Sequence, residues 1–174
     1  TTPGRPQDIK THTPLVHCDY LDAEQLRLFL DDDVLSRNGI LQAFVEPSTD
    51  RMTTIEATFS PATTLLERRV NVNKMDDHRF PAVERMVTFD GADHYSDIVP
   101  VQRPQTITAL KAGCLAIKDH IAGVGPFYLD VGRMVLYLRE DSKRQLWLLW
   151  CTSFRCTPRP DDPKVTNFGP LTLH

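Results

Sequence analysis

Cysteine and histidine side chains are the residues of this chain best suited to bind a metal ion. The cysteines are Cys18, Cys114, Cys151 and Cys156, and Cys18 lies in the tripeptide His17-Cys18-Asp19. Structural zinc sites usually take pairs of ligands about two to four residues apart, so that one turn presents both. Cys151 and Cys156 are five residues apart on a predicted strand, which should turn them to opposite faces. The spacing therefore predicts no metal site and no cofactor.

Two predicted loops combine carboxylates with imidazoles, groups that can bind divalent cations or transfer protons. They contain Asp76-Asp77-His78 and Asp90-Gly91-Ala92-Asp93-His94. Neither segment has the ligand spacing of a calcium loop, and loops collect Asp and Gly because these residues suit turns. We interpret both segments as solvated loops.

A cysteine beside a histidine could form a nucleophile and its base. Cys18, Cys114 or Cys151 could take this role with one of the histidines, and Cys18 with His94 is an example. The serines Ser60, Ser96 and Ser153 could act similarly, but none lies in a Gly-x-Ser-x-Gly motif. The eight glycines also form no phosphate-binding loop. These observations favour a protein without catalytic chemistry. An enzyme is the alternative, because catalytic groups need only meet in space.

The basic residues concentrate between residues 68 and 103. The concentration consists of Arg68, Arg69, Arg79, Arg85 and Arg103. Converging guanidinium groups could bind an acidic protein surface or a phosphate. Glu67 and Glu84 lie nearby, so ion pairs within the chain are the alternative. We predict these five arginines, together with a long loop at 90–104, as a partner-binding site.

Apolar spacing predicts the strands that must position these residues. Alternation indicates strands at 40–46, 53–59, 64–72 and 83–89, the first two joined as a hairpin, and a helix is the other interpretation of 82–88. A second hairpin is predicted from 131–139 and 145–155. Its second strand is apolar on both faces, which is typical of a strand near the middle of a sheet.

Two helices are predicted, at 22–36 and 106–122. Asp22 and Gln25 have the spacing of a capping box at the start of the first helix. The second has Thr106 as a candidate cap, Gly123 as a candidate end and one apolar stripe formed by Ile107, Leu110, Cys114, Ile117 and Ile121. We expect both helices to pack on the sheet.

These elements predict an α+β fold, a mainly antiparallel sheet with two or three helices packed on it. The domain spans 17–156, with an extended arm at 1–16 and a Pro-rich tail at 157–174. Apolar residues make up 41% of the chain, and the net charge of −3 makes a nucleic-acid partner an unfavoured class. The chain contains no run of about 18 apolar residues, so we expect no membrane span and a cytoplasmic protein with reduced thiols.

Three stretches resemble an uncharacterised region in proteins of flagellated eukaryotes, including protists. They are 65–71 (LLERRVN), 83–91 (VERMVTFDG), and 133–138 (RMVLYL) followed by 146–155 (LWLLWCTSFR). The resemblance implies a structural protein of the cilium or flagellum that binds microtubules, through tubulin, or another axonemal protein.

The function predicted from these observations is a non-catalytic protein-binding or scaffold module of the cilium, flagellum or cytoskeleton. The alternatives are an enzyme with a Cys/His-based site and a module that binds a small ligand or peptide. The last alternative predicts an open apolar groove beside Tyr137 and Trp147.

Overall fold

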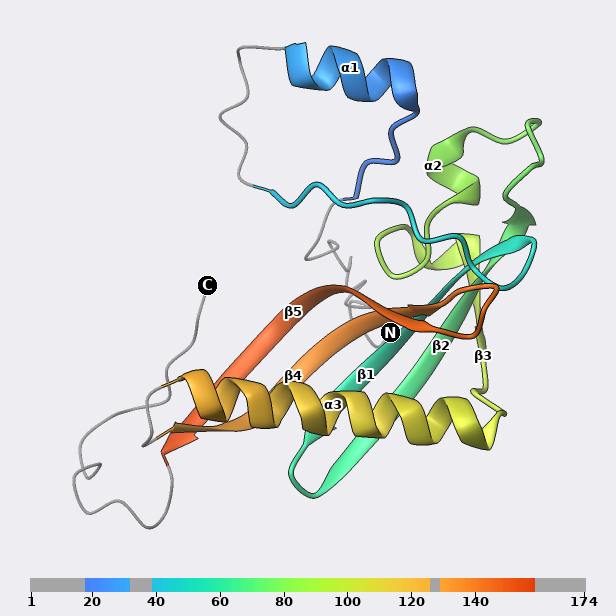
Figure 1. Cartoon of the computed structure of the whole chain (residues 1–174). Coiled ribbons are helices and arrows are strands. Elements are labelled where there is room, and N and C mark those ends of the chain that lie inside the picture. Colours follow the sequence, from blue (N-terminus) through green and yellow to red (C-terminus); the bar gives the residue numbers. More distant parts are fainter. Residues whose placement is uncertain (1–17, 32–38, 126–128, 159–174) are drawn as a thin grey trace, which may run out of the picture.

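A computed structural model describes residues 18–31, 39–125 and 129–158. Its centre is a five-stranded antiparallel sheet with the strand order β3-β2-β1-β4-β5 (Figure 1). The elements in chain order are α1 (Ala23–Asp31), β1 (Arg51–Ser60), β2 (Thr63–Lys74), α2 (Ala82–Arg85), the short 3-10 helix η1 (Asp93–Tyr95), β3 (Ser96–Val99), α3 (Pro104–Val124), β4 (Leu129–Glu140) and β5 (Leu146–Pro158). The predicted α+β class is confirmed.

Strand β1 lies in the middle of the sheet and is covered on both faces. Ile55 and Phe59 are buried beneath α3, whereas Thr54 is fully buried on the opposite face. The prediction that 145–155 forms a central strand is wrong, because β5 is an edge strand. Trp147 and Leu148 of β5 are 47% and 48% exposed. The long apolar run therefore does not reflect burial on two faces.

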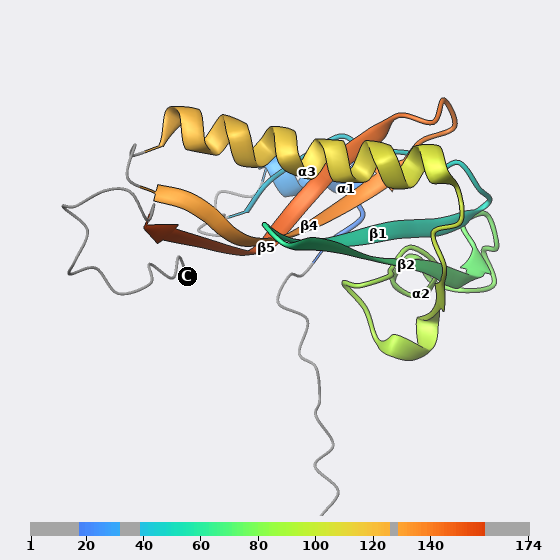
Figure 2. The ribbon, with the colours of Figure 1, turned by 90° about the horizontal axis from the view of Figure 1, so that it is seen from below.

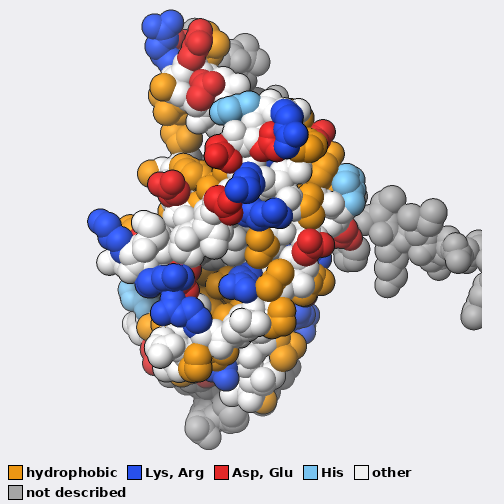
Figure 3. Space-filling model, turned by 90° about the vertical axis from the view of Figure 1, so that its right-hand side faces the viewer, with side chains coloured by type: hydrophobic (Ala, Val, Ile, Leu, Met, Phe, Trp, Pro, Cys, Tyr) orange, Lys and Arg blue, Asp and Glu red, His pale blue; other side chains and the backbone are white. Residues whose placement is uncertain are grey.

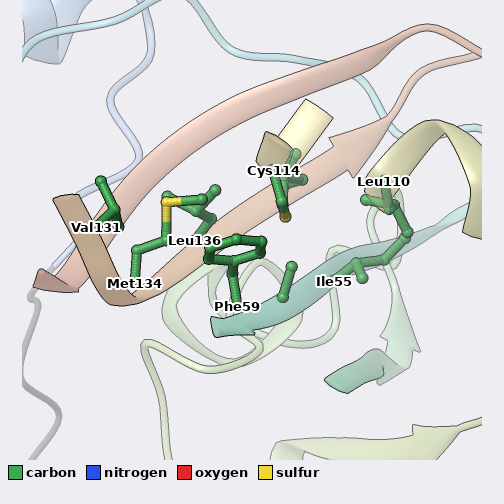
Figure 4. Close-up of a cluster of buried hydrophobic side chains, with 9 residues drawn as sticks. Ile55, Phe59, Leu110, Cys114, Val131, Met134 and Leu136 are labelled. Carbon is green, nitrogen blue, oxygen red and sulfur yellow. The ribbon is translucent and has the colours of Figure 1, made fainter. Parts of the chain in front are cut away.

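Helix α3 covers one face of the sheet, with α2 on the other side (Figure 2). Leu110 and Cys114 of the predicted stripe are buried between α3 and strands β1 and β4 (Figure 4). Burial of a large apolar side chain contributes roughly 1.5–3 kcal/mol, so this stripe holds the helix on the sheet. The boundaries differ from the prediction: Arg103 rather than Thr106 is the N-cap residue, and the helix continues past Gly123 to Val124.

Helix α1 begins as predicted but does not pack as predicted. The Gln25 amide donates to Asp22 Oδ1 at 2.8 Å, and the Asp22 amide donates to Gln25 Oε1 at 3.0 Å, which completes the capping box. The helix has no buried residue, and Leu28 and Leu30 are 58% and 61% exposed. The prediction that this helix lies on the sheet is therefore wrong for 23–31, and 32–36 lie outside the described residues.

Strand pairing in the first half of the chain also differs from the prediction. Strand β1 pairs with β2 through a turn at residues 61–62, and 40–46 forms no strand. Residues 82–85 form the helical alternative, α2, instead of the predicted strand at 83–89. The loop predicted at 90–104 contains β3, which pairs with residues 68–71 of β2. The alternation of apolar and polar residues within one strand does not determine which strand it pairs with, so the strand order could not be predicted from the sequence.

The predicted terminal hairpin is confirmed as β4 and β5. Its register shifts near 131–133 and 135–138, which changes the side-chain alternation along β5. Cys151 pairs with Leu136 and Cys156 with Val131, and both partners belong to the core beneath α3. The expectation that these cysteines point to opposite faces is therefore wrong. Strand β5 reaches Pro158, so its end includes two residues assigned to the tail, while 1–16 and 159–174 lie outside the described residues.

The face of the sheet opposite α3 is held by a buried arginine. Arg139 of β4 is 3% exposed. Its guanidinium donates to the carbonyl oxygens of Thr53 and Val45, each at 3.0 Å, and to Thr54 Oγ1 at 3.3 Å. The same group lies 5.5 Å from the centre of the Phe44 ring. These contacts fasten the segment before β1 to the sheet.

Two further polar side chains close this face. Asn71 is fully buried, and its amide nitrogen donates to the carbonyl oxygens of Glu84 and Val87, each at 2.8 Å. The Tyr20 hydroxyl donates to Asp90 Oδ2 at 3.1 Å. Buried polar groups of this kind are stable because each has its hydrogen-bond partner.

Candidate functional site

A cleft of about 260 Å³ lies where α3 begins. Its walls come from the start of β1, from β2, from the segment before α3 and from the β4–β5 turn. The uncharged lining residues are Ser48, Thr49, Thr53, Ile55, Val70, Val101, Gln102 and Thr106, and the charged ones are Asp50, Arg51, Arg68, Arg103, Glu140 and Arg144. Figure 3 views the molecule from this end, and Lys and Arg side chains gather in its lower half. The cleft thus combines four guanidinium groups with two carboxylates.

Two of the five predicted arginines meet in this cleft. Arg68 lies on β2 opposite Ile55, on the side of the sheet that α3 covers. Arg103 is the residue immediately before α3. They are joined by Arg51 and Arg144, which the sequence analysis did not select. The arginines come from four elements that are far apart in the chain.

Glu140 is the inner carboxylate of the cleft, and its side chain is 12% exposed. Its Oε1 accepts hydrogen bonds from Arg103 at 3.1 Å and Arg144 at 2.7 Å, and its Oε2 accepts one from Thr106 Oγ1 at 2.8 Å. Burial acts to raise the pKa of Glu140, but the hydrogen bonds from Arg144 and Thr106 and the two positive charges outweigh it and lower the pKa. Glu140 is therefore ionised at neutral pH and pairs with two of the four arginines.

The β4–β5 turn directs Arg144 toward Glu140. Asp141 Oδ1 accepts hydrogen bonds from the backbone amides of Lys143 and Gln145, each at 2.8 Å. Arg144 has a φ of 67°, a conformation that costs a non-glycine residue roughly 1–2 kcal/mol. Asp141 Oδ2 also accepts a hydrogen bond from Trp147 Nε1 at 2.9 Å, which links the turn to β5. Asp141 thus maintains a strained turn that supplies one arginine to the cleft.

Arg51 and Arg68 have no carboxylate within ion-pair distance among residues 18–31, 39–125 and 129–158. Arg51 Nη1 donates to the carbonyl oxygen of Val72 at 2.6 Å. The Nε–H of Arg68 is buried and has no hydrogen-bond partner in the described part of the chain. A buried donor without a partner costs about 1–3 kcal/mol. Because Asp50 pairs with Lys74 at 2.8 Å, these two arginines are the charges of the cleft that the fold leaves unneutralised.

The other predicted arginines lie away from the cleft, and two of them have acidic partners. Arg69 contacts Glu67 at 3.1 Å and Asp93 at 2.7 Å on the opposite face of the sheet. Arg79 forms two hydrogen bonds to Asp77, at 2.8 and 2.7 Å. Arg69 and Arg79 therefore form ion pairs within the chain, which was the alternative to partner binding.

Arg85 also points elsewhere, because its guanidinium donates to the carbonyl oxygen of Met75 and contacts His78 Nδ1 at 3.4 Å. The sequence analysis chose arginines that are close in the chain. Arg51 and Arg144 join the site only because β1 lies between β2 and β4. A strand order, rather than a motif, is the signal that would have identified them.

The Cys/His alternative finds little support in the surroundings of Cys18. Burial, the negative charge of Asp90 and a hydrogen bond to Asp90 raise the pKa of the Cys18 thiol to about 12. A nucleophilic cysteine needs the opposite shift. His94 is exposed, and its ring lies 4.0 Å from that of Tyr95. No group of three or more His, Cys, Asp or Glu side chains suited to a metal ion occurs within the described residues.

An apolar groove was expected beside Tyr137 and Trp147, and at Tyr137 the space is filled by side chains. Tyr137 is 9% exposed and stacks on Trp150, with 4.9 Å between ring centres. Phe89 packs edge-on against the same ring at 5.2 Å, and the Tyr137 hydroxyl donates to Glu56 Oε2 at 2.9 Å. Aromatic rings therefore fill the space next to Tyr137.

Comparison of the chain with protein-family models, with curated proteins and with solved structures gave no significant match. Among the described residues, no helix has both the length and the apolar character needed to cross a bilayer. The account of function therefore depends on the cleft itself.

Proposed function

We propose that this protein is a non-catalytic binding module that recognises an acidic segment of a protein partner through the arginine cleft. The observation that carries the proposal is the pair of arginines, Arg51 and Arg68, that share one cleft without a carboxylate partner in the described part of the chain. Guanidinium groups bind carboxylates through two parallel hydrogen bonds, which gives both affinity and orientation. An acidic side chain supplies the acceptors that these two arginines lack.

The size of the cleft agrees with a short segment as the ligand. Its volume of about 260 Å³ is just below the roughly 300–1,000 Å³ of small-molecule sites. Arg103 and Arg144 are half-exposed at 50% and 56%, so approach from solvent is open on that side. One or two acidic side chains can enter while the rest of a partner stays outside.

Binding of a short glutamate-rich peptide, measured by titration calorimetry, tests the proposal. The intact chain should bind the peptide, and the affinity should fall as salt is added, because exposed charges are screened. Replacing both Arg51 and Arg68 with glutamine should weaken binding at least about tenfold, the effect of losing roughly 1.4 kcal/mol of charged hydrogen bonding.

Arg155→Gln is the control for this experiment, matched in charge to the replacement of either cleft arginine alone. Arg155 is exposed on β5, opposite Arg133, and does not line the cleft. It removes one positive charge without touching the proposed site, so binding should change by less than about twofold. Equal losses in the cleft variants and in Arg155→Gln would mean that the peptide responds to net charge, and the proposal would fail.

The cellular setting proposed with this function is the cytoplasm, in the cilium, flagellum or cytoskeleton, with tubulin or another axonemal protein as the partner. It is supported by the resemblance of 65–71, 83–91 and the two stretches of the terminal hairpin. Co-sedimentation with microtubules and recovery from flagellar extract test it, and negative results in both would remove this setting while leaving the peptide experiment unaffected.

The enzyme alternative has a separate test in thiol labelling. With a pKa of about 12, Cys18 should react far more slowly near neutral pH than an ordinary cysteine, because the thiolate is the reactive form. Cys151, which is exposed on β5, is the internal reference. Labelling of Cys18 faster than Cys151 would revive the Cys/His site.

A further inference from the structure

We infer that the arginine cleft is built for a doubly charged oxyanion, and that its ligand is a phosphate monoester carried by a phosphorylated side chain of the partner. This inference rests on the proposed function and specifies the chemical group that the cleft holds.

The charge balance of the cleft favours a dianion. Its lining has four guanidinium groups, from Arg51, Arg68, Arg103 and Arg144, and two carboxylates, from Asp50 and Glu140. The difference is two positive charges, in a chain whose net charge is −3. One glutamate or aspartate would neutralise half of that difference. A phosphate monoester carries about −1.5 to −2 near neutral pH and would neutralise most of it.

The donors of the cleft are divided between an occupied part and an available part. Glu140 already receives hydrogen bonds from Arg103, Arg144 and Thr106, which shows that this end of the cleft accommodates an oxyanion. Arg51 and Arg68 lie on the strands beside it and have no carboxylate acceptor among the described residues: Arg51 Nη1 donates to the carbonyl oxygen of Val72, and the buried Nε–H of Arg68 has no partner. A phosphate monoester offers three free oxygens and up to two negative charges to these two guanidinium groups, whereas a carboxylate offers two oxygens and one charge.

Glu140 also sets a limit on what can bind. Any anion placed beside the Glu140 carboxylate would be repelled, a dianion more strongly than a monoanion, so the ligand must lie away from Glu140 and close to Arg51 and Arg68. The same argument places the ligand on the β1–β2 side of the cleft. Gln102 and the hydroxyls of Ser48 and Thr49 line the cleft as uncharged polar groups that can take the remaining oxygens or the attached chain.

The test compares three short peptides of the same neutral sequence with phosphoserine, glutamate or serine at the centre. Calorimetric titration of the full chain should give binding of the phosphoserine peptide about tenfold tighter than that of the glutamate peptide, and no measurable binding of the serine peptide. Inorganic phosphate should compete with the phosphopeptide. Equal binding of the glutamate and phosphoserine peptides would overturn this inference and leave the proposed function standing. Failure of both peptides would overturn both.

Arginine variants locate the interaction. Arg68→Gln should weaken binding of the phosphoserine peptide about tenfold, and Arg68→Lys should recover only part of it, because lysine keeps the charge but loses the planar fork. Arg155→Gln should leave the affinity within about twofold. Circular dichroism of each variant checks folding, and Arg51→Gln is a second cleft variant in case Arg68→Gln does not fold. Unchanged affinity in both folded cleft variants would place the phosphate elsewhere and contradict the inference.

A comparison of the phosphoserine peptide with inorganic sulfate tests the preference for a doubly charged oxyanion. The second ionisation of a phosphate monoester lies near pH 6, so binding of the phosphoserine peptide should weaken roughly tenfold between about pH 7 and pH 5. The charged groups that face the site are Arg51, Arg68, Arg103, Arg144, Asp50 and Glu140, and Lys74 pairs with Asp50 from outside. The pKa values of Asp50 and Glu140 are lowered, so both stay ionised across this range. The affinity for sulfate should therefore stay constant over this pH range. An equal loss of affinity for the phosphate monoester and for sulfate would contradict a preference for a dianion.

Binding of inorganic phosphate by itself distinguishes a free phosphate compound from a phosphorylated partner. If inorganic phosphate binds in the cleft but the phosphoserine peptide binds no more tightly, the ligand is a free phosphate compound, and the assignment to a phosphorylated partner is overturned.

Discussion

The two faces of the sheet each hold an arginine that is at least partly buried, and the two arginines differ in how they are satisfied. On the face opposite α3, Arg139 donates three hydrogen bonds to Thr53, Val45 and Thr54. On the face beneath α3, Arg68 keeps its buried Nε–H without a partner among the described residues. The first arginine ties the fold together, and the second raises the free energy of the folded state.

This difference separates structural cations from candidate ligand-binding cations. A buried charge with all its acceptors in the protein has no reason to attract a ligand. A buried donor without an acceptor is destabilising unless something else supplies the acceptor. Arg51 and Arg68 lie in a cleft, and Arg69 and Arg79, which have carboxylate partners, do not. The Nε–H of Arg85 is also buried without a partner in the described part of the chain, but Arg85 does not line the cleft. Position in the cleft and the lack of a carboxylate partner together select Arg51 and Arg68 for function, without reference to any motif.

The largest expected effect on stability comes from Arg139, the arginine whose hydrogen-bond acceptors all lie in the protein. Arg139→Met should lower the free energy of unfolding by about 3–5 kcal/mol, because it leaves one buried and two partly buried acceptors without their donor and detaches the segment before β1. Urea denaturation followed by circular dichroism measures this. A loss below about 1 kcal/mol would show that the Arg139 hydrogen bonds do not hold that face.

Leu110→Ala should cost about 2–5 kcal/mol, measured in the same way. Leu110 is fully buried in the core beneath α3, and its removal leaves a cavity. Leu115→Ala is the matched control on the same helix, because Leu115 is 51% exposed and should cost under about 1 kcal/mol. Similar losses for the two leucines would contradict the packing of α3 described above.

Arg68→Leu should change stability in the opposite direction. Replacing the unsatisfied guanidinium with an apolar side chain beside Ile55 and Val70 should stabilise the free protein by about 1 kcal/mol while weakening peptide binding about tenfold. The readouts are urea denaturation and calorimetric titration of the same variant. Destabilisation of a size similar to that of Arg139→Met would show that Arg68 is a structural residue and would remove the contrast between the two faces.

The smallest expected effect depends on pH. The lowered pKa of Glu140 means that its ionised form stabilises the folded state above the ordinary value of 4.5, and that this contribution disappears as the pH falls through the lowered value. Glu140→Gln should therefore be less stable than the original chain by about 0.5–1 kcal/mol near neutral pH, with the difference vanishing in acid. A difference that persists at low pH would assign the effect to packing rather than to the charge of Glu140.

Local features of the sequence predicted the parts of the fold that depend on neighbouring residues. The capping box at Asp22 and Gln25, the stripe of α3 with Leu110 and Cys114, and the terminal hairpin are all present. Each depends on contacts within a few turns or across one tight turn. The α+β class followed from these elements together.

Features that depend on distant contacts were not predictable in the same way. The apolar run of β5 suggested a central strand, but the edge position is decided by β1 pairing with both β2 and β4. The same strand order brings Arg51 and Arg144 to Arg68 and Arg103. Local spacing could therefore name two of the four arginines of the cleft, but not the site that they form.

The central claim is that the two cleft arginines left without carboxylate partners, Arg51 and Arg68, bind the ligand. Nuclear magnetic resonance of the arginine Nε–H groups during addition of inorganic phosphate tests it most directly. The account predicts saturable shifts for Arg51 and Arg68 and no comparable shifts for Arg69 and Arg139, whose partners lie in the protein. Equal shifts in all four, or none in Arg51 and Arg68, would contradict it.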